Sequence, residues 1–262
     1  MRVYSGKSFS DICEAITIDF VDAPDVHVGE WQAIQADIPQ ADTVELEDVS
    51  FEMEIGLGSG NWPVEWLQDV IRPNMPWAEE HFQERVSGIP HNPPPSHVRW
   101  PYAQKSNNEH MANQQFSHTY PERFWPKWAG QDNEVHQGIR YPWGDLSDVV
   151  RLLQERPGTR QAYLPVWFPE DTGAVSDQRV PCTLGYHFLI RDNKLKVVYY
   201  IRSCDFFRHF RDDVYMAGRL AQWIADQLPN VVASKLVMHI SSLHIFSAER
   251  GIITSYAQEI MR

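Results

Sequence analysis

Two short stretches of the chain contain residue types that could do covalent chemistry. In the first, RVPCTLGYHF (residues 179–188), Cys182 follows a proline and precedes a strand-like run. A thiolate is a strong nucleophile, but an ordinary thiol has a pKa of about 8.5 and needs positive charge nearby to ionise. Taken alone, Cys182 is better explained as a small buried apolar residue. Its neighbours in the fold therefore decide whether it is a nucleophile.

The second stretch, RSCDFFRHFRDD (residues 202–213), places polar groups at the end of an apolar strand. Arg202 offers a charged fork and Ser203 a hydroxyl donor, which together suit the oxygens of a phosphate group. A solvated strand end explains this pair equally well. Asp212 and Asp213 open a helix, where acidic residues are favoured by capping and by the helix dipole. Each feature taken singly thus has a structural and a functional interpretation.

The patterns around these stretches predict the elements that would position them. Alternation predicts a strand over 43–55, and a proline in the first turn with Gly88 as a stop predicts a helix over 77–87. Further patterns predict helices over 145–158 and 212–228, strands over 160–168 and 234–246, and two strands within 183–203 joined by an Asp-Asn-Lys turn. Residues 1–60 have a strand-rich pattern, and the proline-rich residues 89–127 are typical of a long ordered loop. The mixture predicts one α+β domain.

Composition limits the possible partners of the chain. Its 262 residues carry a net charge of −12, which argues against a nucleic-acid-binding surface because phosphate neutralisation needs clustered lysine and arginine. The sequence has no run of about 18 apolar residues, so we expect no membrane span. It also lacks an apolar leader segment, so we expect no secretion signal. The three cysteines form no CxxC pair, so we expect a reducing, cytoplasmic setting with neither a disulfide framework nor a structural metal site.

From Tyr141 to Phe246 the order of motifs resembles the thymidylate synthase family, which includes the pyrimidine nucleotide hydroxymethylases. GIRYPWG (138–144) looks like the family's Gly-Pro-Val-Tyr-Gly segment, and GTRQAYLPVW (158–167) looks like its Ser-Arg-Arg strand. VPCTLGYHFLIRDNKLKVVYYIRSCD (180–205) is similar to the catalytic Pro-Cys-His strand, hairpin and Arg-Ser-Cys-Asp signature at the family spacing. SLHIF (242–246) looks like the Asp-Ala-His-Ile-Tyr segment.

The resemblance implies a thymidylate synthase-like α+β fold, in which a mixed or antiparallel sheet packs against helices and also forms a homodimer. The whole chain, 1–262, would be one such domain. It would have a divergent N-terminal part (1–75), a proline-rich insertion (89–130) and a catalytic core (138–246).

The resemblance also implies roles for individual residues. Cys182 would attack C6 of a pyrimidine nucleoside 5′-monophosphate, so that C5 becomes a carbon nucleophile and takes a one-carbon unit from 5,10-methylenetetrahydrofolate. Arg202 and Ser203 would hold the 5′-phosphate, and Arg160 would reach across the dimer interface to the partner's phosphate.

The remaining implied contacts are to the base, the sugar and the folate. Tyr141 would lie near the reacting base. Asp205 would contact the base through its backbone or order the folate, and His244 would hydrogen-bond the ribose 3′-OH.

Several positions depart from the family pattern. Gln161 replaces a basic residue, Thr183 a histidine, His187 a glutamine and Phe246 the sugar-binding tyrosine, whose hydroxyl donor is lost. Sixteen residues follow Phe246, where the family has a longer tail that closes over the folate.

The most informative departure is Asp213, because synthases that act on a uracil nucleotide carry asparagine there. An amide can serve both N3–H and O4 of uracil. A protonated carboxyl group instead matches cytosine, since its O–H can donate to N3 while its other oxygen accepts from the N4 amino group. Asp213 therefore favours a cytosine nucleotide, as in the cytidylate hydroxymethylases, which add water after folate departs. The short tail agrees with a reaction that needs water.

Such a reaction also needs a general acid–base carboxylate, which the family places on an early helix ending in a Ser-Gly pair. In WAEEHFQERVSG (77–88), strict alignment on that pair puts the glutamate at His81, and a slip of one residue reaches Glu80. We expect Glu80 to be this general acid–base carboxylate, with Glu84 and Glu79 as alternatives. The competing structural explanation is that these glutamates only form a solvated acidic helix face.

Together these features predict a homodimeric enzyme that hydroxymethylates C5 of a cytosine nucleoside monophosphate, with dCMP as the expected substrate and CMP left open. Two alternatives remain: a thymidylate synthase acting on dUMP, and a non-catalytic nucleotide-binding protein with the same fold.

Overall fold

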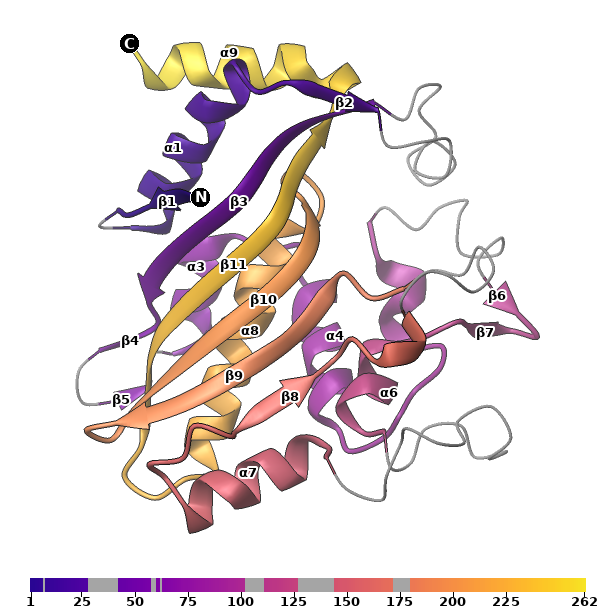
Figure 1. The fold of residues 1–262 in the computed structure, drawn as a ribbon, viewed down its shortest axis with the longest axis vertical. Coiled ribbons are helices and arrows are strands. Elements are labelled where there is room, and N and C mark those ends of the chain that lie inside the picture. The colour runs from indigo at the N-terminus through magenta and orange to yellow at the C-terminus, as the bar shows by residue number, and fades with distance from the viewer. Residues whose placement is uncertain are drawn as a thin grey trace.

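The chain folds around a seven-stranded sheet in the computed structural model (Figure 1). The structure describes residues 1–6, 8–27, 42–57, 60–61, 63–101, 111–126, 144–171 and 180–262. The strand order is β1-β3-β11-β10-β9-β8, and β2 pairs with β3 beside this path. The strands of this sheet are β1 (Arg2–Tyr4), β2 (Asp25–His27), β3 (Asp42–Glu54), β8 (Tyr163–Pro165), β9 (Thr183–Arg191), β10 (Lys194–Asp205) and β11 (Val232–Phe246). Pairing is antiparallel except for β1 with β3 and β10 with β11, so the sheet is mixed.

Helices and short turns connect the strands. The helices are α1 (Phe9–Val21), α3 (Val64–Ile71), α4 (Trp77–Val86), α6 (Tyr120–Phe124), α7 (Leu146–Glu155), α8 (Phe210–Asp226) and α9 (Arg250–Ile260). Three 3-10 turns, η1 (Pro95–Arg99), η2 (Pro169–Asp171) and η3 (Ser247–Glu249), and two small ribbons, β4–β5 (Gly56–Leu57, Gly60–Asn61) and β6–β7 (Met111–Ala112, Gln115–Phe116), complete the described elements. No helix in the described ranges is long and apolar enough to cross a bilayer.

The core lies between the sheet and the helices on one of its faces. Helix α8 packs on β10 and β11, and α3 and α4 pack on α8 behind the sheet (Figure 1). Along β10 the core-facing Val197, Tyr199 and Ile201 are buried, whereas Lys196 and Tyr200, on the other face, are partly exposed. This alternation follows from the period of two in a strand. On the opposite face the described part of the chain leaves Lys196 and Tyr200 partly exposed, and we refer to this face as the open face of the sheet.

Most predicted elements are confirmed near their expected bounds. The strand predicted over 43–55 is β3, the helix over 77–87 is α4, and the hairpin within 183–203 is β9–β10, which turns at Asp192 and Asn193. Both turn residues have positive φ angles, which asparagine and aspartate tolerate better than other side chains.

Two predictions of local structure were wrong. The strand-rich interpretation of residues 1–60 missed α1, which begins at a Ser8 capping box and buries one helical face. The strand expected over 160–168 is only the three residues of β8, because the chain on either side leaves the ladder with β9.

Candidate active site

Cys182 lies immediately before β9 and is partly exposed. Cys13 and Cys204, by contrast, are buried, and none of these three described cysteines forms a disulfide. The Cys182 carbonyl accepts a hydrogen bond from the Arg202 amide at 2.9 Å, which fixes the nucleophile candidate beside the end of β10. Cys182 packs against the core and still keeps exposed surface, which a nucleophile needs.

An irregularity in the sheet presents this cysteine. The β9–β10 register shifts between Tyr200, which faces Gly185, and Ile201, which faces Thr183, so Leu184 is the extra residue of a bulge. Gly185 is required at this corner because a Cβ atom there would lie 2.4 Å from the Tyr163 hydroxyl oxygen. Bulges often aim side chains at functional sites.

Arg202 holds the segment that leads to Cys182. Its Nε donates to the Pro181 carbonyl at 2.9 Å and an Nη to the Val180 carbonyl at 3.3 Å, and its guanidinium lies 5.4 Å from the Trp167 ring centre. Ser203 follows it on β10 and is partly exposed. The structure thus places both predicted phosphate ligands next to Cys182, and their binding role stays a prediction.

Asp213 stands at the start of α8 behind the ends of β9 and β10. The Cys204 thiol contacts its Oδ2 at 3.7 Å. Burial raises the pKa of Asp213 to about 7, although the Arg85 guanidinium and a hydrogen bond from Tyr199 act in the opposite direction. By its accessible surface Asp213 is partly buried. A carboxyl group with such a pKa carries a proton about half of the time near neutral pH.

A buried hydroxyl chain joins this region to Cys182. The Thr183 hydroxyl is 2.8 Å from the Tyr199 hydroxyl and donates to the Tyr120 hydroxyl at 3.2 Å. Burial raises the pKa of Tyr120, and the charges of Cys182 and Asp213 raise it further, so these three groups share one electrostatic environment. The chain therefore connects α6, β9 and β10 at the site.

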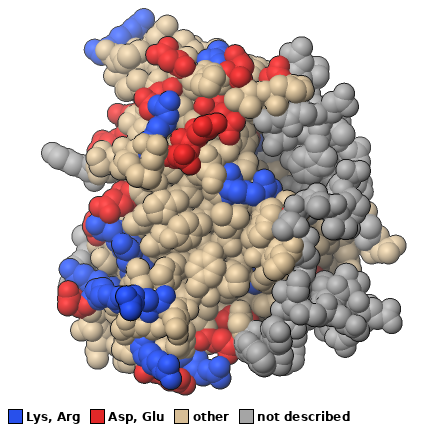
Figure 2. Space-filling model, viewed as in Figure 1, with Lys and Arg blue, Asp and Glu red and all other residues tan. Residues whose placement is uncertain are grey.

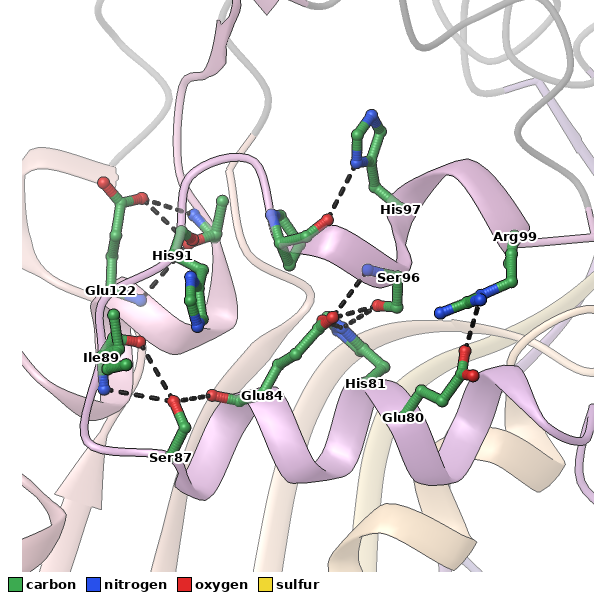
Figure 3. A network of polar contacts seen from close by, with 12 residues as sticks. Glu80, His81, Glu84, Ser87, Ile89, His91, Ser96, His97, Arg99 and Glu122 are labelled. Atoms are coloured by element: carbon green, nitrogen blue, oxygen red, sulfur yellow. Dashed lines mark hydrogen bonds and ion pairs between the residues drawn. The ribbon is translucent and has the colours of Figure 1, made fainter.

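The three candidate glutamates of α4 lie in different surroundings, and Figure 3 shows two of them, Glu80 and Glu84. Glu79 points to α8, where it accepts hydrogen bonds from both Arg219 and Tyr215. Glu80 pairs with Arg99 at 2.8 Å and is one third exposed. Glu84 accepts from the Ser96 amide and hydroxyl, both at 2.6 Å. The catalytic use of any of them stays a prediction.

His81, at the strictly aligned position, belongs to the Glu84 network. Its Nδ1 is 3.3 Å from Glu84 Oε2 and 3.2 Å from the Ser96 hydroxyl oxygen, whose own proton goes to Glu84. Burial lowers the pKa of His81 to about 4, so the ring is neutral at neutral pH. Because Nδ1 faces two acceptors, it carries the ring proton, and Nε2 is the unprotonated nitrogen.

Asp205 and His244 pair across β10 and β11. The Asp205 carboxylate accepts from the Phe207 and Arg208 amides and from the Arg208 guanidinium, so it orders the turn into α8. His244 is buried, and its carbonyl accepts from the Phe206 amide. Phe246 is covered by the Arg208 guanidinium, 4.7 Å from its ring centre. The expected ligand contacts of Asp205 and His244 stay predictions.

Two further predicted residues lie at the edge of the site or outside it. Arg160 is exposed next to β8, and its carbonyl contacts His187 Nε2 at 3.0 Å. Tyr141 lies outside the described residues. Its predicted position near the base is therefore a sequence-based expectation only.

Aromatic rings line the approach between α4, η1 and the start of α8. Trp77 stacks on His81 and lies 6.3 Å from Trp100, which in turn stacks on His209 at 5.2 Å. The indole nitrogen of Trp77 is a buried donor that has no hydrogen-bond partner among the residues that the structure describes. Flat rings and an unused donor are suited to a flat heteroaromatic ligand.

Three residues of the site were not predicted from the sequence: Arg85, Tyr120 and Tyr199. The position of Tyr199 could have been predicted, because the alternation of β10 points it to the same face as Val197 and Ile201. Arg85 and Tyr120 carry no comparable signal, because their meeting depends on the packing of α4 against α6.

Comparisons with known proteins bear on this arrangement. The family model described as thymidylate synthase matches residues 99–258. A protein of Methanosarcina barkeri, described provisionally as a thymidylate synthase, is 24% identical over 147 residues, covering 56% of this chain and 61% of that protein. The thymidylate synthase of Francisella tularensis subsp. holarctica is 23% identical over 144 residues, covering 48% of this chain and 52% of that protein. The chain thus spans about half to three fifths of these relatives.

A solved structure extends the likeness to nearly the whole fold. The crystal structure of thymidylate synthase from T4 phage superposes with a TM-score of 0.61, covering 95% of this chain and 80% of that one at 14% identity. The chain belongs to the thymidylate synthase family. The predicted fold class, a mixed sheet packed with helices, is confirmed.

Proposed function

We propose that the protein transfers a one-carbon unit to C5 of a pyrimidine nucleoside 5′-monophosphate, and that the product is a 5-hydroxymethylcytosine nucleotide, with dCMP as the first candidate substrate. Family membership supports the one-carbon chemistry. The observation that carries the choice of base is the partly buried Asp213 carboxyl group, whose pKa of about 7 keeps a proton available for N3 of cytosine.

In this proposal, individual residues of the chain have the following roles in binding and catalysis. The Cys182 thiolate adds to C6, while Arg202, Ser203 and the partner subunit's Arg160 bind the 5′-phosphate. Asp213 holds the N3 and N4 edge, Asp205 and His244 position base and sugar, and Tyr141 lies near the base. Glu80, with Glu84 or Glu79 as alternatives, moves protons at the reacting carbon.

The co-substrate would be 5,10-methylenetetrahydrofolate, which supplies the one-carbon unit. The aromatic rings of Trp77, Trp100 and His209, together with the unused indole donor of Trp77, fit its pterin ring. These residues would hold that ring and keep it beside the turn of α8 that carries Asp213.

The test incubates the purified protein with methylenetetrahydrofolate and each of dCMP, CMP, dUMP and UMP, followed by mass spectrometry of the nucleotides. We expect a hydroxymethyl gain on a cytosine nucleotide alone, and none with Cys182→Ala. Full activity of Cys182→Ala would contradict the covalent mechanism.

The same assay decides between the two alternatives. Thymidylate synthesis is favoured because the relatives described above are thymidylate synthases by name, and it would appear as a methyl gain on dUMP with formation of dihydrofolate. Nucleotide binding with no mass change and no exchange of the C5 hydrogen would indicate a binding protein.

A further inference from the structure

Arg85 is a buried cation at the centre of the site. Only 3% of its surface is exposed, and its guanidinium lies 4.0 Å from the Tyr120 ring centre. Its carbonyl is fixed by the Trp125 indole at 2.8 Å, so the helical turn that carries it is held in place. Tyr120 in turn contacts Thr183, the neighbour of Cys182.

No carboxylate neutralises this cation in the described part of the chain. Its Nε is buried without a hydrogen-bond partner, and no ion pair or hydrogen bond of the guanidinium joins it to another residue there. An uncompensated buried charge costs several kcal/mol, at an order-of-magnitude level. The other buried arginine of this region, Arg123, has a bidentate carboxylate partner. A negative charge that forms during the reaction would compensate Arg85.

Asp213 is the group positioned to acquire that charge. Arg85 belongs to the cluster of side chains around this acid: its guanidinium lies 4.0 Å from the Tyr120 ring centre, and the Tyr120 and Tyr199 hydroxyls both contact Thr183. The Arg85 charge lowers the pKa of Asp213, and the Cys204 thiol contacts the same carboxyl group at 3.7 Å. Tyr186 is buried and Tyr120 is partly buried, and both have raised pKa values, so they keep their protons, whereas the Asp213 carboxyl can lose its own.

We propose that Arg85 is a positioning residue that stabilises the Asp213 carboxylate formed when this acid protonates the substrate base. The proposal rests on the function proposed above. As the Cys182 sulfur bonds to C6, the C5=C6 electron pair moves to C4–C5 and the C4=N3 pair moves to N3. N3 takes the Asp213 proton, the O–H bond breaks, and the positive charge of Arg85 stabilises the new carboxylate. Charge is conserved, and C5 becomes the enamine carbon that attacks the one-carbon donor.

Among the other groups around Asp213, the charge of Asp212 opposes this step, whereas the hydrogen bonds from Cys204 and Tyr199 favour the carboxylate but carry no positive charge. Asp212 precedes it on α8, where Asn74 holds its carboxyl group through two hydrogen bonds at 2.7 and 2.8 Å, and its charge works against ionisation of Asp213. Cys204 and Tyr199 approach from β10, Tyr186 from β9 and Tyr120 from α6. Among these described side chains around Asp213, Arg85 from α4 carries the positive charge.

The first test follows the protonated Asp213 carboxyl by infrared difference spectroscopy against pH, with Asp213→Asn to assign the band and to subtract Asp212. In the wild type the band should disappear near pH 7. Arg85→Met should move the midpoint upward by about one unit, because an opposite charge at close range lowers a carboxyl pKa by that order. Arg85→Lys and Arg151→Met, an exposed arginine of α7, should leave the midpoint in place. An unmoved midpoint in a folded Arg85→Met protein would overturn the proposal.

The second test follows turnover of the cytosine nucleotide against pH. Arg85→Met should lower the plateau of kcat about tenfold, since one pKa unit is worth one decade of rate, and should shift the alkaline limb upward. A purely structural role would lower the plateau without moving the limb, and that result would also overturn the proposal. If the wild type turns over no pyrimidine nucleotide, the proposed function fails, while a shifted infrared midpoint would still support the coupling of Arg85 to Asp213.

Discussion

At the scale of single residues, the proton on Asp213 decides which base the site can accept. Its carboxyl group lies among Cys204, Tyr199 and Arg85, and burial outweighs the neighbouring cation. When protonated, it can donate to N3 and accept from the amino group of cytosine. When ionised, it can only accept, and N3 of cytosine then faces a second acceptor. The base preference is therefore tied to pH.

Replacement of Asp213 by asparagine should reverse that preference. The amide can accept from N3–H of uracil and donate to O4, but it leaves a mismatch with cytosine. We expect kcat/KM for the cytosine nucleotide to fall on the order of 10²-fold or more, because a site built for hydrogen bonds discriminates strongly against mismatched partners. The uracil nucleotide should gain measurable turnover. Steady-state kinetics with dCMP and dUMP would measure both changes.

The pH profile supplies the check on this prediction. Because burial raises the pKa of Asp213 to about 7, its competent protonated form is lost as pH rises through 7, so wild-type turnover of cytosine should decline on the alkaline side. The Asp213→Asn variant has no such group and should lose that limb with uracil. A limb that persists unchanged in the variant would assign the titration to another residue.

At the scale of elements, helix α6 brings Tyr120 to the site and is tied to η2 by a buried ion pair. Arg123 donates two hydrogen bonds of 2.9 Å to Asp171, which also accepts from the Phe168 amide at 2.8 Å. The Arg123 and Asp171 side chains are only 3% and 6% exposed. Loss of Arg123 would leave the Asp171 carboxylate buried without its guanidinium partner.

Arg123→Met should therefore destabilise the protein by about 3–5 kcal/mol, as expected when one member of a buried pair is removed. Arg151→Met is the matched control: its pair with Asp148 has a 65% exposed arginine, and such pairs contribute about 0–1 kcal/mol. Chemical denaturation of both variants measures the difference. Equal stabilities would mean that the Arg123–Asp171 pair does not hold α6 in place.

The elements also show where sequence patterns succeed. The β9–β10 hairpin and α8 were predictable because their burial alternates with the period of a strand or a helix and their boundaries carry turn residues. Helix α1 had a comparable signal in its Ser8 capping box and its buried Ile12, Ile16 and Phe20, but this signal was not recognised. The contact between Arg85 and Tyr120 joins residues far apart in the chain, so no local pattern predicts it.

At the scale of the whole molecule, the open face of the sheet is the surface on which the proposed homodimer would form. The view in Figure 2 shows that the middle of this face has few charged side chains, while acidic and basic groups gather toward its margins. Tyr200 and His239 stack on it at 5.3 Å, and His239 contacts Ser50 at 2.7 Å. An uncharged surface with aromatic side chains is typical of the centre of an interface.

Arg160 gives the dimer proposal its sharpest test. It is exposed at the edge of this sheet, and its guanidinium makes no ion pair with a described residue. If it completes the partner's phosphate site, Arg160→Ala and Cys182→Ala homodimers should each be nearly inactive. Coexpression should restore about a quarter of wild-type activity, because half of the dimers are mixed and each mixed dimer has one complete site.

The alternative gives a different result in the same experiment. If Arg160 served its own subunit, one site of a mixed dimer would lack the arginine and the other the cysteine, so coexpression would restore nothing. Capture of one variant through a tag on the other confirms that mixed dimers are present, and a monomeric mass in light scattering would contradict the dimer itself. Recovery of activity would mean that neither subunit alone contains a complete phosphate site. Dimer formation through the open sheet face would then be required for catalysis at Cys182.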